Sequence, residues 1–179
     1  MSDARSLLSD RAAELRLAFD RSFAEARPPD PSPSENLLAI RLGSEPYALR
    51  LSEIAGLFVG QKITRLPSRI PALLGIAGFR GTILPVYDLH VLLGHPPAET
   101  MRWLVTDAGA SVAFAFAAMD GHIRVSRDAI VASERSGNSR AHVREFARTP
   151  ELVRAIVHLP SVFDAIRDQV SENTKKEER

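Results

Sequence analysis

Apolar residues recur at intervals of three and four near the start of the chain, and they alternate with other residues further along it. The first pattern predicts an amphipathic helix from about Ala4 to Ala26. Its apolar stripe consists of Leu8, Ala12, Leu15, Phe19 and Phe23. The stripe either packs on the chain's own domain or serves as a docking helix for a partner.

A proline-rich stretch follows this helix and divides the chain. The four prolines between residues 28 and 33 cannot continue a helix and favour an extended connector. We therefore predict an N-terminal helix at 1–27, a linker at 28–35, a domain at 36–167 and a charged tail at 168–179.

The body of the chain contains many short apolar runs separated by turn residues. Alternation over Leu38–Leu42, a turn at Gly43 and the run Tyr47–Leu49 predict a strand, a turn and a strand. Further strands are predicted at Leu57–Val59, Leu73–Phe79, Thr82–Val86, Trp103–Thr106 and Val112–Phe116. Turns are predicted at 107–109 and 120–121. Short strands at this spacing are typical of a mainly β barrel or sandwich.

Two short helices interrupt the strands. Asp88 is suited to cap the first helix, which Gly94 ends. The second helix is predicted to begin near Pro160 and to continue through Ile166. The last residues, Ser171–Arg179, are rich in charge and are expected to form a frayed tail.

Composition narrows the classes of partner. The chain has 179 residues and a formal net charge of +1, and so small a charge argues against nucleic-acid binding. It has no cysteine, which excludes disulfides and thiolate chemistry. No apolar run approaches the roughly 20 residues that span a bilayer, and the N-terminus does not resemble a signal peptide. We expect a cytoplasmic protein with no direct membrane insertion.

Residue patterns typical of catalysis are missing from the sequence. The histidines have neither the spacing nor the glutamate partner of a metal-binding helix, and no nucleophile elbow or phosphate loop occurs. Gly75, Gly78 and Gly81 have the wrong spacing for a dinucleotide fingerprint and indicate tight turns. We therefore expect no catalytic residue, no metal and no cofactor, and a protein that is not an enzyme.

One ordered run of motifs says more about the family of the chain than its composition does. It consists of Ile63–Pro67 followed by Pro71–Leu89, with Leu42–Leu51 upstream. This run resembles the core signature of the CheW-like domain family, the coupling and scaffold proteins of bacterial chemotaxis. The resemblance implies two SH3-like, five-stranded β-barrel subdomains, here preceded by the amphipathic helix.

The resemblance also implies two protein partners. Leu51 and Ile54 match apolar positions that the family presents to the regulatory domain of the histidine kinase CheA. Leu57 matches a position beside the groove that binds the cytoplasmic tip of a methyl-accepting chemoreceptor, and Arg80 is assigned to the same surface. The competing interpretation for Leu51, Ile54 and Leu57 is that they are core residues.

The remaining motif positions have physical roles of their own. Gly81 after Arg80 allows a tight hairpin, Gly75 and Gly78 indicate close backbone approach, and Pro85 is expected at a strand edge or bulge. Arg80 either pins this turn or meets a carboxylate of a partner.

The chain also departs from the family pattern. Gly56 stands where the family commonly has a glutamate that is thought to pair with the arginine matched by Arg80, so that pair cannot form. Gly78-Phe79 replaces an asparagine-leucine, and the stretch up to Ile130 is shorter than usual, which indicates a trimmed second barrel.

These features predict an adaptor in two-component signal transduction that couples chemoreceptors to CheA at membrane-associated receptor arrays. One alternative is an adaptor of the same fold in a chemosensory-like system that controls motility, development or gene expression. The other is a small ligand-binding barrel or enzyme, which would need a concave site with converging polar groups.

Overall fold

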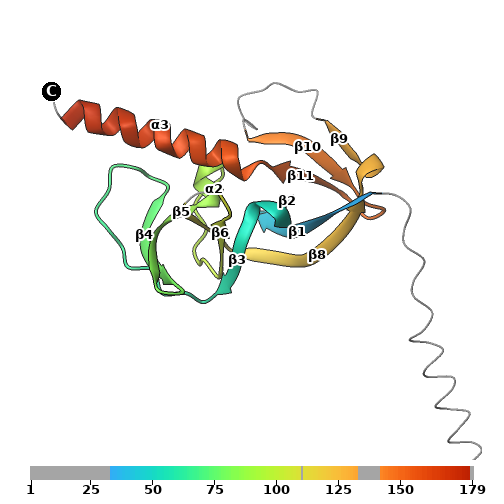
Figure 1. The fold of residues 1–179 in the computed structure, drawn as a ribbon, viewed down its shortest axis with the longest axis horizontal. Helices are drawn as coiled ribbons and strands as arrows, with labels where there is room; N and C mark the ends of the chain where they lie inside the picture. Colours follow the sequence, from blue (N-terminus) through green and yellow to red (C-terminus); the bar gives the residue numbers. More distant parts are fainter. Residues whose placement is uncertain (1–32, 110, 133–141, 178–179) are drawn as a thin grey trace, which may run out of the picture. The chain divides into compact units, whose positions relative to one another are not determined.

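The computed structural model describes residues 33–109, 111–132 and 142–177. The predicted N-terminal helix lies outside the described residues. The first strand begins at Ser34, inside the predicted linker. Figure 1 shows a mainly β domain from Ser34 onward, built from two sheets and few helices, which confirms the predicted fold class.

The first sheet contains strands from both ends of the domain. Its six strands lie in the order β8-β1-β2-β11-β10-β9. Their bounds are β1 Ser34–Leu42, β2 Glu45–Arg50, β8 Ala118–Ser126, β9 Ile130–Ala132, β10 Val143–Arg148 and β11 Val153–Val157. Neighbours are antiparallel except β2 and β11, which pair in parallel with Ala155 opposite Tyr47. The last strand of the chain therefore lies beside the second.

The second sheet is built from the middle of the chain. Its five strands lie in the order β3-β6-β7-β5-β4. Their bounds are β3 Ile54–Val59, β4 Leu73–Phe79, β5 Thr82–Asp88, β6 Trp103–Asp107 and β7 Ala113–Phe116. Phe58 of β3 and Phe79 of β4 touch at a ring-centroid distance of 4.9 Å, so the two edges of the sheet approach each other. This curvature is compatible with an SH3-like barrel.

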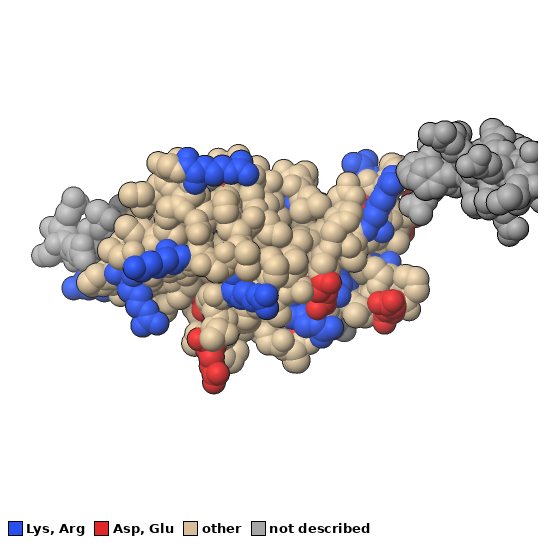
Figure 2. All heavy atoms as spheres, turned by 90° about the horizontal axis from the view of Figure 1, so that it is seen from below, with Lys and Arg blue, Asp and Glu red and all other residues tan. Residues whose placement is uncertain are grey.

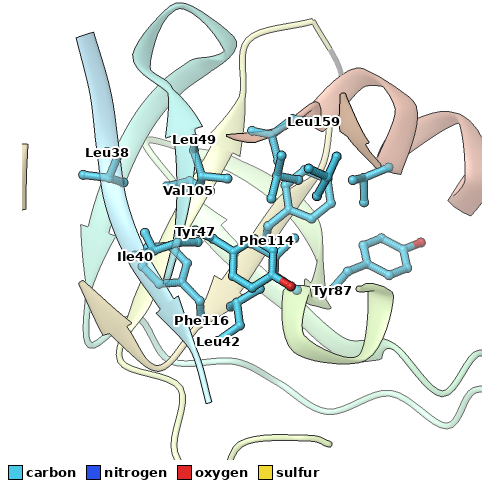
Figure 3. Packing of buried hydrophobic residues seen from close by; sticks show 14 of the residues in the cluster. Leu38, Ile40, Leu42, Tyr47, Leu49, Tyr87, Val105, Phe114, Phe116 and Leu159 are labelled. Carbon is cyan, nitrogen blue, oxygen red and sulfur yellow. The ribbon is translucent and has the colours of Figure 1, made fainter. Parts of the chain in front are cut away.

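Three hydrophobic clusters explain the near-continuous apolar runs of the sequence. In β7, Phe114 and Phe116 belong to the largest cluster, which lies between the sheets, whereas Ala113 and Ala115 belong to the interior of the second sheet. In β11, Ile156 belongs to the interior of the first sheet. Figure 3 shows the largest cluster, in which side chains from β1, β2, β6 and β7 meet Leu159. Strands buried on both faces lose the simple apolar-polar alternation.

The short helices connect these layers. The 3-10 helix η1 (Leu51–Glu53) joins the two sheets, η2 (Arg127–Ala129) separates β8 from β9, and α2 (Leu89–Leu92) follows β5. The C-terminal helix α3 (Leu159–Glu177) packs Val162 and Ile166 into the largest cluster. None of the helices in the described residues combines the length and apolar character that a bilayer crossing needs.

Several details differ from the predictions. The first sheet has six strands instead of five, because η2 sets off the three-residue strand β9. The second half of the domain contributes the four strands β8 to β11 in the described residues. The prediction of a frayed tail is wrong as far as Glu177, where α3 ends. The predicted turn at Asp120-Gly121 lies inside β8, where the pairing with β1 shifts at Ala39/Ile40.

Candidate functional site

The predicted binding residues Leu51, Ile54 and Leu57 lie on one continuous segment, η1 followed by β3. Leu51 in η1 is 36% exposed and Leu57 in β3 is 41% exposed. Ile54 is half-buried and packs against the largest core cluster. The structure thus places two of these side chains at the surface and one partly in the core.

Alternation along β3 produces an exposed apolar strip. Ala55, Leu57 and Val59 are exposed, and we call these three residues the β3 strip. In the pairing of β3 with β6, Leu57 lies opposite Val105 and Val59 opposite Trp103. Residues directly opposite each other in a ladder lie on the same face of the sheet. Because Val105 belongs to the cluster between the sheets and Trp103 packs against that cluster, the β3 strip continues the core onto the surface.

Arg50 fixes the start of this segment to the first sheet. Its guanidinium bonds Glu35 of β1 at 2.9 Å and Glu145 of β10, and lies 3.9 Å from the carboxylate of Glu53. Burial lowers the pKa of Arg50, but the hydrogen bonds that Arg50 donates to Glu145 and Glu35 outweigh that effect and raise it. The charged form is thus held between three glutamates.

Glu53 fixes the same segment to two further elements. Its Oε2 accepts a hydrogen bond from the backbone N–H of Leu159 at 3.0 Å, and its carbonyl oxygen accepts one from Ala108 at 2.9 Å. Burial raises the pKa of the Glu53 carboxyl. Because η1 is tied to β1, β10, α3 and the β6–β7 turn, Leu51 is presented from a rigid support.

A shallow cleft lies beside η1. It has a volume of about 300 Å³ and is lined by Ser52, Glu53, Asp107, Ala108, Gly109, Pro160, Phe163 and Asp164. The carboxylates of Glu53 and Asp107 already accept backbone hydrogen bonds from Leu159 and Gly109. Within the described residues, no cluster of histidine, aspartate and glutamate has the arrangement of a metal site.

The β4–β5 hairpin holds most of the motif residues. Arg80 at φ +47° and Gly81 at φ +87° form its two-residue turn, a combination typical of type I′ turns. Pro85 lies opposite Ile76 of β4 and precedes the part of β5 that pairs with β7, so the strand has only one neighbour there. Asp88 accepts a hydrogen bond from the His90 N–H at 2.8 Å and caps α2.

Two glycines of the motif have different surroundings. Gly75 has φ +142°, and a Cβ there would overlap the carbonyl oxygen of Thr64, whose backbone pairs with Ile76. Gly78 is exposed with open space around it, and its carbonyl oxygen accepts a hydrogen bond from Gln61 at 2.6 Å. Only Gly75 is required by both its conformation and its close contact.

The structure explains why position 56 is a glycine and not the glutamate that is common in the family. A Cβ at Gly56 would lie 2.7 Å from the Phe58 ring and 3.2 Å from Thr106 Oγ1. Phe58 and Thr106 therefore occupy the space that a side chain at position 56 would need. Arg80 is exposed, and no ion pair joins it to a carboxylate in the part of the chain that the structure describes.

Two of the predicted binding residues, Leu57 and Arg80, are each next in sequence to a residue of one contacting pair of rings. Phe58 next to Leu57 touches Phe79 next to Arg80, so the chain segments of these two residues meet where the sheet edges approach. Leu51 and Ile54 lie at the other end of β3. The supporting residues Arg50, Glu35, Glu53 and Glu145 were missed, because the Arg50–Glu145 contact spans 95 positions of sequence.

Comparisons with known proteins agree with this geometry. A family model described as the CheW-like domain matches residues 36–167. The structure is similar to the scaffolding protein TtCheW from Thermoanaerobacter tengcongensis, with a TM-score of 0.62 and 20% sequence identity. That similarity covers 70% of this chain and 89% of TtCheW. The comparison with curated proteins returned no match. The match over residues 36–167, together with the two-sheet fold and its ordered hairpin motif, means that this chain belongs to the CheW-like domain family.

Proposed function

We propose that this chain is a chemotaxis adaptor that couples chemoreceptors to a CheA-like histidine kinase through protein–protein contacts. Family membership supports the adaptor role, because CheW-like proteins act as scaffolds and not as enzymes. The observation that carries the proposal is the exposed apolar β3 strip beside the rigidly held η1. Apolar side chains on a fixed support are suited to serve as anchors in a partner's pocket.

The kinase regulatory domain is the proposed partner of η1 and the start of β3. Leu51 is the exposed anchor, and Ile54 supports it from the edge of the core. The receptor tip is the proposed partner of the other end of β3, where Leu57 and Arg80 lie on segments that touch. A cytoplasmic location at receptor arrays follows from these two partners.

Binding of the kinase regulatory domain tests the first contact. Leu51→Asp places a charge at the anchor and is expected to weaken binding by about 1 to 3 kcal/mol, the usual cost of losing a buried anchor. Val153→Asp is a matched control, because Val153 is also exposed at 51% but lies on β11. Calorimetric titration of the full chain measures both variants. Equal affinities for the two variants, or no binding by the wild type, would reject this kinase surface.

Binding of a receptor tip fragment tests the second contact. Leu57→Asp and Arg80→Ala are expected to weaken that binding while the affinity for the kinase domain stays unchanged. Circular dichroism confirms that both variants are folded. The receptor assignment is wrong if both variants bind the fragment as the wild type does.

A further inference from the structure

One end of the second sheet gathers segments that are far apart in sequence. The N–H of Gly60 donates to the carbonyl of Arg102 at 2.9 Å, and Gln61 donates to the carbonyl of Gly78 at 2.6 Å. Thr64 pairs with Ile76. The chain from Gly60 to Thr64 therefore runs across the start of β6 and the end of β4.

Basic side chains dominate this end. Lys62, Arg65, Arg80 and Arg102 are all exposed, and we call them the basic rim. Between residues 60 and 102 the acids are Asp88, which is buried, and Glu99. In the described residues no ion pair joins a rim residue to a carboxylate. Figure 2, which views the molecule from below, shows more basic than acidic side chains on a largely uncharged surface.

Apolar side chains are exposed beside these cations. Val59 is 57% exposed and precedes Gly60, and Ile83 is 70% exposed and lies three residues beyond Arg80. The Arg102 guanidinium lies 5.6 Å from the centre of the Trp103 ring. The rim thus combines cations that bind no carboxylate of the described residues with exposed apolar side chains.

At the opposite end of β3, the charged side chains already pair with one another. Glu53 lies 3.9 Å from the Arg50 guanidinium, and Asp164 bonds Arg167 at 3.1 Å. Asp107, which lies opposite Ile54, is buried. Six residues of strand span about 20 Å, which is more than twice the Debye length of about 8 Å at physiological salt. The two ends of β3 therefore act independently on a docking partner.

We propose that the basic rim binds the acidic end of an amphipathic segment whose apolar side packs on the β3 strip. The charged groups at the far end of β3 already pair with one another, so attraction to the rim favours one orientation of the partner along the strip. This inference rests on the proposed function, because we take the partner segment to belong to the receptor tip. To the proposed receptor contact, this inference adds the sign of the charge on the partner segment and the direction in which that segment lies along β3.

Charge reversal away from Arg80 tests the inference separately from the receptor assignment. The rim variant Lys62→Glu/Arg102→Glu is compared with Arg144→Glu/Arg148→Glu on β10, which changes the net charge equally at another exposed site. Association of the full chain with a receptor tip fragment is measured by surface plasmon resonance at about 50 mM and about 500 mM NaCl. Thermal melts confirm that both variants are folded.

The expected result is an association rate on the order of tenfold lower for the rim variant than for the control at low salt, with a smaller ratio at high salt. Equal rates for the two variants would overturn the inference while the receptor assignment stands. Failure of the wild type to bind the fragment would overturn both.

A membrane is the competing acidic surface. Sedimentation with vesicles of phosphatidylglycerol and phosphatidylcholine is expected to recover neither wild type nor rim variant. Wild-type binding to these vesicles that the rim variant loses, with unchanged receptor binding, would overturn the inference in favour of lipid.

Discussion

At Gly75, two constraints act on a single residue. Its φ of +142° is a conformation that side chains with a Cβ rarely adopt, and a Cβ would overlap the backbone of Thr64. The backbone pairing of Thr64 with Ile76 holds the segment that carries Lys62 and Arg65 against β4. Gly75 therefore determines where half of the basic rim lies.

We predict that Gly75→Ala lowers the free energy of unfolding by about 2 kcal/mol or more, because both constraints are violated. Gly78→Ala is the control, since Gly78 has open space around it and is expected to change stability by less than about 0.5 kcal/mol. Urea denaturation of both variants measures the difference. Similar losses at the two positions would contradict this explanation of the motif.

His90 is a buried titratable residue next to the motif. It is 3% exposed, and its Nε2 has no hydrogen-bond partner among the described residues. Burial lowers its pKa, and the neighbouring Asp88 offsets this only in part. His142 has a pKa that is lowered by burial in the same way.

This shift predicts a loss of stability in mild acid. Because the native pKa of His90 lies below the unfolded value of 6.5, the unfolded state binds more protons as the pH falls through that value. Stability is therefore highest above this pH and decreases below it. We expect His90→Leu to reduce the slope of unfolding free energy between about pH 7.5 and about pH 5.5. An unchanged slope would show that His90 does not contribute.

At the scale of elements, the Arg154–Asp120 ion pair lies at the register shift between β1 and β8. Arg154 of β11 is buried, bonds Asp120 at 2.7 Å and donates to the carbonyls of Ile40 and Tyr47. Arg41 bonds the same carboxylate at 3.0 Å. Asp120 lies where the register of β1 and β8 shifts, so these contacts hold four strands, β1, β2, β8 and β11, together at that point.

We predict that Asp120→Ala lowers the free energy of unfolding by about 1 to 3 kcal/mol, because Arg154 stays buried without its carboxylate partner. Burial raises the pKa of Asp120, but hydrogen bonds from Arg154 and Arg41 outweigh this and lower it. The carboxylate therefore stabilises the fold above its unfolded pKa of 3.8 and loses that effect as the pH falls.

Chemical denaturation at neutral pH measures the effect of Asp120→Ala. Asp128→Ala in η2 is the control, because Asp128 is exposed and makes no ion pair among the described residues. Equal stability of the two variants would contradict a structural role for the Asp120–Arg154 pair.

The ease of prediction also differs between elements. Apolar runs such as Val112–Phe116 indicated strands correctly, because burial on both faces leaves a short continuous apolar segment. The strand β8 was missed, because it has few large apolar residues and the Asp120-Gly121 pair is typical of a turn. The motif in β4 and β5 indicated its hairpin directly, since the turn conformation depends on adjacent residues.

At the scale of the whole molecule, the two sheets divide the domain, with strands from its middle in one sheet and strands from both sides of that middle in the other. Periodicity could not show this arrangement, because it depends on the parallel pairing of β11 with β2. The β3 strip was found in part, since Leu57 was named for its family match. Its support by Glu35, Glu53 and Glu145 depends on contacts across the fold that no local pattern reveals.

We propose that one chain binds two proteins at once through the two ends of β3. Simultaneous binding is measured by sedimentation velocity of the full chain mixed with a kinase regulatory domain and a receptor tip fragment. We expect a ternary complex for the wild type, and a smaller fraction of ternary complex with more receptor-bound pair for Leu51→Asp. Mutually exclusive binding of the two partners by the wild type would rule out simultaneous binding.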